Sequence, residues 1–455
     1  MGDVNVEDRA TLDRDVARAV AALARWRRDV ASDAEGAHDE PLAAFRAIAG
    51  KSTWDALGAL SVNAADEPLR TGLRRWTAAL LQARLSATDD VTVAREEAAM
   101  RARFEGEPPR DVSWHQAWRG IVGARTSWEA RRWLLAAAEA ATPIADARRT
   151  RSERRAEVAR RLGFVHPWDA AVPPATAPSL LASARRFLDG TDDLWRVVRR
   201  EALRGTDRAD TADVLQFALA REAGEGWPAR LTPRWLSDVF GAGVSRLPIE
   251  LPPLPEPLGA SSFMRALRIF GGAVRVAAAP RSAPFAVRSD PAFVGAHRDA
   301  VLFGSLAADP VFHVRVLALG QTRAAAQCRI LARTALLDAR IDAARVVVGG
   351  GGVEPARDVF DEMGERLFGA PLDARLRGAW PRSRDDEPAR WTALVQGPAL
   401  RLATRNSFDT DWFRNPKAWA HLLARAAAPA YESLEEGCLE AGPIALARTF
   451  EEALG

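Results

Sequence analysis

The stretch Thr11-Leu-Asp-Arg-Asp-Val-Ala-Arg-Ala-Val-Ala-Ala-Leu-Ala-Arg-Trp26 shows the pattern that runs through the whole chain. Its large apolar side chains recur three or four residues apart, at Leu12, Val16, Val20, Leu23 and Trp26. This spacing places them on one face of an α-helix and predicts an amphipathic helix over Thr11–Val30. Alanine and arginine, which fill many of the other positions, both have high helix propensity.

Similar patterns continue along the chain and predict a mostly α fold. The other predicted helices are Pro41–Ala49, Thr53–Ser61, Pro68–Ser86, Arg148–Leu162, Ser179–Leu188, Asp192–Leu203, Thr211–Arg221, Leu258–Ala279, Pro291–Ala308, Gln321–Val347, Arg357–Phe368, Pro388–Thr404, Pro416–Ala427 and Pro443–Ala453. Ala283–Ser289 is expected to be short and extended, and the glycines of Gly349–Gly352 to form a turn. We find no internal repeat and no βαβ alternation.

A proline-rich segment, Leu247–Leu258, interrupts the helices. Proline lacks the backbone donor that a helix needs, so this segment is predicted to be extended. Because it is also apolar, it is expected to lie along the body as a strap. We therefore predict three parts: an N-terminal helical lobe over 1–150, a second helical block with the strap over 151–257, and a C-terminal lobe over 258–455.

The composition is that of a soluble globular protein. The 455 residues are 48% hydrophobic and 27% charged, and 63 basic residues nearly balance 60 acidic ones, which argues against disorder. Acids and bases alternate along the helices, so no nucleic-acid partner is expected. No apolar run is long enough to span a membrane, and Met1–Asp8 lacks the apolar core of a secretory signal. A cytoplasmic location without membrane contact is therefore expected.

The residues that usually carry catalytic chemistry are scarce. There are two cysteines and six histidines, no two histidines stand four residues apart, and no H-E-x-x-H occurs. No G-x-S-x-G elbow or dinucleotide fingerprint is present, and the four-glycine run lacks the Lys-Ser/Thr of a phosphate-binding loop. From the residues alone, we expect no catalytic constellation, no metal and no cofactor.

One segment adds a more specific signal. Phe408-Asp-Thr-Asp-Trp-Phe-Arg-Asn-Pro416 resembles the F-G-E-D-W-[WFY]-x-N-P run of the thimet oligopeptidase and oligoendopeptidase F group of zinc metallopeptidases. Leu306–Phe312 and the predicted long helix over Thr322–Ala344 look like the region after that group's zinc site, and Arg154–Gly163 is similar to a linking segment. The resemblance implies a bilobal helical clamshell with a cleft between the lobes and minor β structure in the C-terminal lobe.

The resemblance also implies where a zinc site would have stood. The group's active helix reads H-E-x-G-H-A-x-H, and a glutamate further along completes the metal site. Aligned with Arg268-Ile-Phe-Gly-Gly-Ala-Val-Arg275, this motif puts Arg268 and Gly272 at the histidine ligands and Ile269 at the catalytic glutamate. His297 falls at the third ligand. The single tyrosine, Tyr431, lies beyond the segment that holds the group's carbonyl-polarising tyrosines.

These substitutions predict a catalytically inactive relative, a pseudopeptidase without zinc. A hydrolytic zinc site needs three protein ligands and an open water position, and Arg268 would repel the ion. Ile269 cannot act as a general base. Peptide or protein binding in the cleft is then the expected function. Arg268 and Arg275, two helical turns apart on one face, would present guanidinium groups to a carboxylate in the cleft. The alternative is that both sit at the surface or in ordinary salt bridges.

Three alternatives remain open. The first is that the alignment with the zinc motif is wrong, so that Leu267–Ala278 is a plain core helix and no former metal site exists at these positions. A second alternative is a regulatory or structural partner of an active sibling peptidase, since tryptophan and arginine are enriched at interfaces and the chain has 15 tryptophans. The third is a hydrolase that uses a chemistry other than zinc.

Overall fold

The computed structural model describes residues 8–32, 40–105, 109–124, 126–172, 175–203, 214, 227, 232–244, 247–251, 260–350, 356–380, 385–431 and 437–455. Apart from Val214, the predicted helix over 211–221 lies outside these ranges, as does most of the proline-rich strap. The described start of the strap, 247–251, is not helical, and its Leu247, Ile249 and Leu251 pack against a buried apolar cluster as expected.

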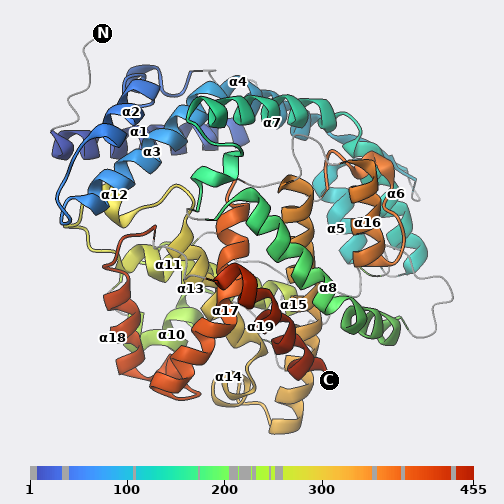
Figure 1. Cartoon of the computed structure of the whole chain (residues 1–455). Coiled ribbons are helices and arrows are strands. Elements are labelled where there is room, and N and C mark those ends of the chain that lie inside the picture. The colour runs from blue at the N-terminus through green and yellow to red at the C-terminus, as the bar shows by residue number, and fades with distance from the viewer. Residues whose placement is uncertain are drawn as a thin grey trace.

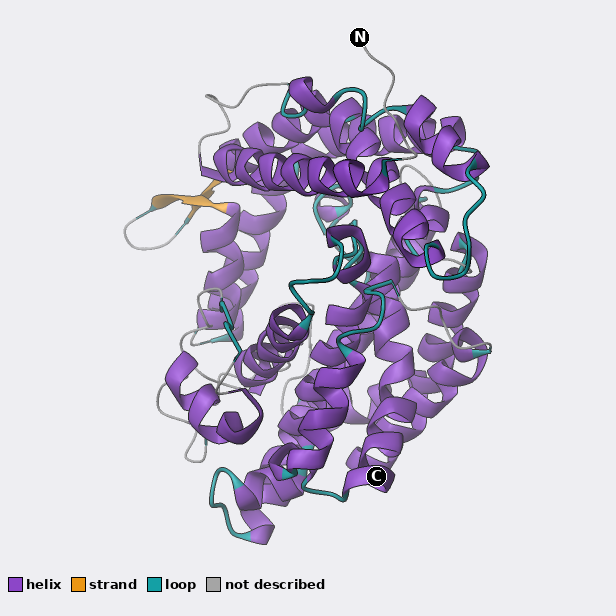
Figure 2. Ribbon diagram, turned by 90° about the vertical axis from the view of Figure 1, so that its left-hand side faces the viewer, coloured by secondary structure: helices purple, strands orange, loops and turns teal. Residues whose placement is uncertain are grey.

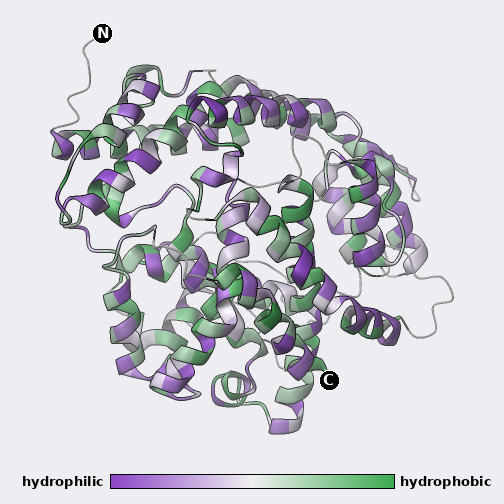
Figure 3. Ribbon diagram, in the orientation of Figure 1, coloured by the Kyte–Doolittle hydropathy of each residue, from purple (hydrophilic) through white to green (hydrophobic). Residues whose placement is uncertain are grey.

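The N-terminal helices form an arch over the rest of the molecule (Figure 1). The elements of this arch are α1 (Arg9–Ser32), α2 (Lys51–Ala59), α3 (Glu67–Leu85), α4 (Ala87–Ala99), β1 (Arg101–Phe104), β2 (Arg110–Ser113), α5 (Trp114–Gly123), α6 (Ser127–Ala141) and α7 (Ile144–Arg161), with short 3₁₀ turns at Ala43–Phe45 and, after α7, at Pro167–Ala170. Figure 3 shows that α7, along the top of the arch, is largely hydrophilic.

The remaining helices form a body beneath the arch (Figure 1). They are α8 (Ala177–Ala202), α10 (Pro233–Val244), α11 (Ala260–Ala278), α12 (Phe285–Arg288), α13 (Val294–Gly304), α14 (Pro310–Arg315), α15 (Gln321–Gly350), α16 (Arg357–Phe368), α17 (Glu387–Phe408), α18 (Pro416–Arg425) and α19 (Cys438–Leu454), with 3₁₀ turns at Ser305–Ala308, Ala374–Leu376 and Trp412–Arg414. The mostly α fold is therefore confirmed. None of the described helices is both long and apolar enough to cross a membrane.

The β structure of the described residues is one antiparallel pair at the edge of the molecule (Figure 2). Ala102 pairs with Val112 and Phe104 with Arg110, and the inward side chains Phe104 and Val112 are buried. The strands thus belong to the N-terminal half, not to residues 258–455 as predicted, where the described residues hold none. The reason is local: Pro109 cannot continue a helix, and Phe104 stacks on Trp133 of α6, which fixes the pair on the arch.

Three further predictions of local structure are wrong. Pro41–Ala49 contains one 3₁₀ turn instead of a helix, and Ser179–Leu203 is not two helices but part of the continuous α8, which passes through Gly190. Gly349 and Gly350 are the last residues of α15 instead of a turn. A would-be Cβ on Gly350 would lie 2.8 Å from Leu181, so close helix packing explains why glycine stands there.

A short segment of the body, α12 and the residues after it, is bonded to the arch. Ala283–Ser289 was expected to be extended, but Phe285–Arg288 forms a helical turn because the Asp13 carboxylate of α1 accepts hydrogen bonds from the backbone N–H groups of Phe285 and Ala286, each 2.8 Å long. Further on, the indole of Trp76 on α3 donates to the Ser289 carbonyl at 2.9 Å. These bonds place α3 against the body.

Buried apolar clusters lie on both sides of this joint. One lies among α1 to α4 and includes Ala286 of α12. A second fills the interior between α5 to α8 and the helices α15, α16, α17 and α19, and a third lies among α10, α11, α13 and α18. On α11, the predicted apolar face is confirmed by Phe263, Leu267, Phe270 and Val274, which are at most 3% exposed. The proposed three-part division of the chain stays a prediction.

Candidate functional site

The helix aligned with the zinc-binding motif, α11, packs closely against α13, which carries His297. The contact runs through small residues, with Gly271 and Gly272 on α11 facing α13. A Cβ added to Gly271 would lie 2.6 Å from the Asp299 carbonyl oxygen, whereas one on Gly272 would lie 3.4 Å from that of Ala296. Position 272 therefore has room for a side chain where position 271 has none.

Arg268, at the position of the first histidine, lies along α13. A Cβ on Gly304 would stand 2.5 Å from its Cγ, so the glycine leaves the space that the arginine stem occupies. The charge of Arg268 acts on Asp338 of α15: burial raises the pKa of the Asp338 carboxyl, and Arg268 opposes that rise. The guanidinium is thus next to a carboxylate within the fold, and Ile269 beside it is half-buried.

His297 does not face a metal-ligand set. Its Nε2 lies 2.9 Å from Oδ2 of Asp386, the residue that precedes α17, and its side chain is 19% exposed. Gly272 offers no donor atom, and Arg268 is a permanent cation. Within the described ranges, no group of three or more histidine, cysteine, aspartate or glutamate side chains could hold a metal ion. These residues do not fit the zinc ion that the resemblance implies.

Arg275, two turns after Arg268, has a structural role. It is 5% exposed, its Nη1 donates a 2.7 Å hydrogen bond to the backbone carbonyl of Arg425, and its guanidinium lies against Gly295, where an added Cβ would stand 3.0 Å from Nε. Burial lowers the pKa of its guanidinium, and Asp299 opposes this shift. Arg275 of α11 therefore bonds within the fold to the end of α18, beside α13.

A cleft of about 1040 Å³ lies between the arch and the body. One wall comes from α2, α3 and the segment after α7, and the other from α13, α17 and the chain around α18. Five arginines line it: Arg70, Arg74, Arg75, Arg298 and Arg425. Glu67 is the one acidic residue among the described lining residues. We call this cavity the arginine cleft; neither Arg268 nor Arg275 lines it.

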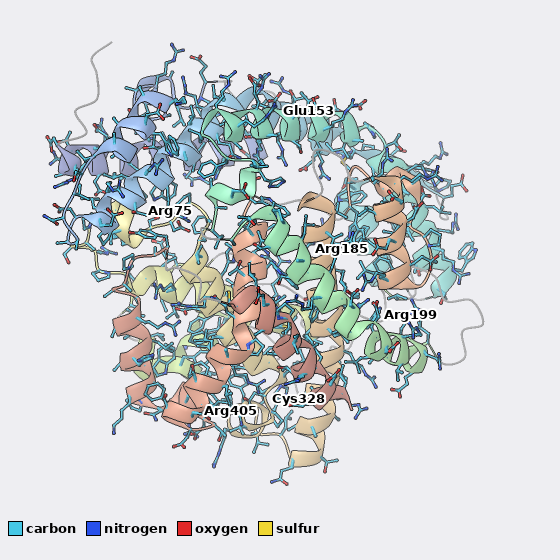
Figure 4. The ribbon with its side chains drawn as sticks, viewed as in Figure 1. Arg75, Glu153, Arg185, Arg199, Cys328 and Arg405 are labelled. Atoms are coloured by element: carbon cyan, nitrogen blue, oxygen red, sulfur yellow. The ribbon has the colours of Figure 1, made fainter. Side chains whose placement is uncertain are left out.

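Two of the five arginines are paired with carboxylates, Arg70 within α3 and Arg75 with Asp290 of the body. Arg70 binds Glu67 with both ends of its fork, at 2.9 and 2.6 Å, and its hydrogen bond lowers the pKa of Glu67. Arg75, labelled in Figure 4, donates to Asp290 at 2.8 Å and to the Ala171 carbonyl at 2.7 Å. Both therefore brace the cleft.

The opposite wall has more cations than acids. Arg425 donates to the Asp299 carboxylate, and Nε of Arg298 lies 3.9 Å from the same group. The positive charge of Arg275 also interacts with Asp299. The buried carboxylate of Asp299 therefore interacts with three guanidinium groups, and none of the described residues that line this wall is acidic.

The apolar part of the lining includes three aromatic rings, Trp54, Phe164 and Tyr431. Trp54 meets Phe164 edge to face with ring centroids 6.1 Å apart. The Tyr431 hydroxyl donates to the Pro68 carbonyl at 2.7 Å, and burial raises its pKa to about 12. Tyr431 therefore stays a neutral hydrogen-bond donor that ties the C-terminal wall to the start of α3.

The search of the sequence for catalytic motifs did not identify the residues that line the cleft. The sequence does hold a local signal for one wall, because Glu67, Arg70 and Arg74 stand three and four residues apart and must share a helix face. It holds none for Arg298 and Arg425, which reach the cleft only through the tertiary fold.

Comparison with known proteins gives a match in fold but not in sequence. No family model matches the chain, and no curated protein matches it. Its structure is similar to that of PZ peptidase A solved with an inhibitor, with a TM-score of 0.56 and 10% identity over 88% of this chain and 84% of that one.

Two other solved structures share the fold. One is a Bacillus anthracis protein described as an oligoendopeptidase F, with a TM-score of 0.53 and 10% identity over 88% of this chain and 83% of that one. The other is a Chlamydophila abortus protein described as a peptidase, with a TM-score of 0.55 and 11% identity over 89% and 81% of the two chains. The chain therefore has the fold of oligoendopeptidase F-like peptidases.

Proposed function

We propose that this chain is a relative of the oligoendopeptidase F-like metallopeptidases that has lost zinc-dependent hydrolysis and binds a peptide or protein segment in the arginine cleft. The shared fold supports the relationship. The observation that carries the loss of catalysis is the α11–α13 contact, where Arg268, Ile269, Gly272 and His297 supply neither a ligand set nor a general base.

Peptide binding is supported by the shape and lining of the cleft. A volume of about 1040 Å³ between two walls is that of a ligand-sized site. Aromatic and aliphatic lining suits side chains, whereas guanidinium groups and the Tyr431 hydroxyl suit the polar groups of a peptide.

Metal analysis and peptide binding together test this proposal. Purified protein incubated with zinc and then desalted is expected to retain far less than one zinc per chain and to leave a pool of fluorescent octapeptides uncut. The same pool, followed by fluorescence anisotropy, is expected to bind. One tightly held zinc per chain, or hydrolysis of the pool, would overturn the loss of catalysis. A pool that never binds would overturn the cleft as a peptide site.

A reconstruction tests the placement of the former site. The quadruple variant Arg268→His, Ile269→Glu, Gly272→His and His297→Glu is expected to bind zinc, because position 272 has room for a Cβ. The matched variant carries Gly271→His in place of Gly272→His and is expected to bind none, since its Cβ would collide with the Asp299 carbonyl. A folded first variant without zinc affinity would contradict the alignment.

A further inference from the structure

The cationic side chains of the arginine cleft differ in how completely the fold neutralises them. Arg70 is paired with Glu67, and Arg75 is paired with Asp290. Arg425 shares the single carboxylate of Asp299 with other arginines. The described lining therefore holds more arginines than acidic residues, with arginines on both walls.

Arg74, on α3, is the clearest part of this surplus. No described residue accepts a hydrogen bond from its guanidinium or forms an ion pair with it, and its Nε is buried. The charge of Asp55 acts on Arg74, but Asp55 is already bound by Lys51 at 2.5 Å. Burial lowers the pKa of Arg74, and the charge of Arg70 adds to that effect, so an added anion would stabilise the charged form.

The guanidinium of Arg74 is nevertheless held in one place. Its Cζ lies 4.0 Å from the ring centroid of Trp54, a cation–π contact that orients its plane. A Cβ on Gly58 would come within 3.2 Å of the guanidinium, so the absence of a side chain there leaves room for it. A fixed plane with unused N–H groups at its edge is the geometry that binds a carboxylate with two parallel hydrogen bonds.

We infer that the ligand of the arginine cleft is an acidic peptide, with one carboxylate bound by Arg74 against Trp54 and another near Arg425 on the facing wall. This inference rests on the proposed function and specifies its ligand. The apolar lining, including Phe164 and Leu400, favours a peptide over a small inorganic anion, which would leave that surface in contact with water.

Three labelled octapeptides of one Ala/Leu scaffold test the inference, carrying three glutamates, three glutamines or three lysines at the same positions. The wild-type protein is expected to bind the glutamate peptide about tenfold or more tighter than the glutamine peptide, because a hydrogen bond to a charged group is the stronger kind. Binding of the lysine peptide is expected to be weaker still. Added salt should weaken binding of the glutamate peptide most.

Variants place the effect on Arg74. Arg74→Gln is expected to lose most of the preference for glutamate over glutamine, and Arg74→Lys to keep part of it, since lysine retains the charge but not the fork. Arg185→Gln is the matched control: it makes the same charge change on α8, outside the cleft, and should alter affinity by less than about twofold.

The outcomes separate this inference from the proposed function. If the glutamate and glutamine peptides bind wild type equally well, or if Arg74→Gln keeps the full preference, the acidic ligand is wrong while peptide binding stands. If none of the three peptides and no member of the octapeptide pool binds, the proposed function fails as well. Free glutarate and inorganic phosphate serve as competitors, and displacement of the glutamate peptide by either at similar concentration would show that the site binds small anions instead.

Discussion

Arg340 and Arg74 occupy contrasting regions of the same molecule. Arg340 of α15 is fully buried, and four acceptors surround its guanidinium at 2.6 to 3.2 Å: Leu188 O, Thr191 Oγ1, Asp192 Oδ1 and Arg366 O. Arg74 lines a cleft and has one aromatic face but no acceptor among the described residues. Arginine therefore has two roles in this chain: Arg340 stabilises the fold through its hydrogen bonds, whereas Arg74 is the side chain that we propose binds the ligand.

The contrast distinguishes an arginine whose hydrogen bonds stabilise the fold from one that lines the cleft. Burial lowers the pKa of Arg340 to about 10, so it remains charged at neutral pH and depends on its acceptors. Those acceptors come from α8 and α16, which α15 therefore holds together. Arg74, in contrast, lines the cleft without an acceptor among the described residues.

The largest expected effect comes from removing the buried arginine. Arg340→Met keeps the apolar stem but leaves the carbonyls of Leu188 and Arg366 buried without this donor, which should cost about 3 kcal/mol of stability. Thermal unfolding should show a clear loss, whereas the exposed Arg196→Gln on α8 should unfold like wild type. A midpoint for Arg340→Met equal to that of wild type would break the comparison.

Arg268 lies between the two extremes, because its stem is packed while its charge faces Asp338. Gly304→Ala would place a Cβ 2.5 Å from Cγ of Arg268 and is expected to cost about 2 kcal/mol. Gly272→Ala on the facing helix is the matched control, since its Cβ meets only ordinary contacts at 3.4 Å or more. Equal losses in the two variants, measured by thermal unfolding, would contradict a tight fit around Arg268.

A smaller effect depends on pH. Because burial raises the pKa of Asp338 above its ordinary value of 3.8, the folded state keeps a proton that the unfolded state loses, so this residue destabilises the fold as pH rises above that value. Asp338→Asn should therefore unfold at higher temperature than wild type at about pH 7, and the gain should shrink as pH falls towards 4. A gain that grows towards low pH would reverse the sign and show that Arg268 dominates.

The smallest effect is expected at Arg74. Since it makes no hydrogen bond or ion pair with the described residues, Arg74→Gln should change stability by less than about 0.5 kcal/mol, mostly through its contact with Trp54. Comparison with Arg75→Gln, which breaks the bond to Asp290, sharpens the point, because that variant should lose clearly more. A large loss in Arg74→Gln would make this arginine structural, like Arg340.

Much of the helical fold could be predicted because its signal is local. The stripe of α1 and the span Arg357–Phe368 of α16 follow from residues within a few turns of one another. Local patterns fail where a distant group decides. The α12 turn depends on a carboxylate 272 positions away in the chain, and the continuity of α8 through Gly190 depends on packing against α15 and α19.

The candidate site likewise has parts that could be predicted from the sequence and parts that could not. The alignment of Arg268–Arg275 predicts that a site stood on α11, and the packing of α11 against α13 puts the helix with His297 beside it. The sequence could not show that Arg275 would bond to the Arg425 backbone. Nor could it assemble the cleft, whose arginines come from positions 70 to 425 and meet only when arch and body are joined.

The bond between Asp13 and α12 has a consequence for the order in which the molecule is built. Asp13 leaves the ribosome early, but the N–H groups that it caps follow some 272 residues later, and Trp76 and Arg75 likewise await Ser289 and Asp290. Contacts of such long sequence separation form slowly, because closing the loop costs chain entropy before the contacts can contribute any favourable free energy. The arch can therefore acquire its helices during synthesis, while the cleft takes shape only after its lining residues Arg425 and Tyr431 have emerged, so the proposed ligand could bind only late in the life of each new chain.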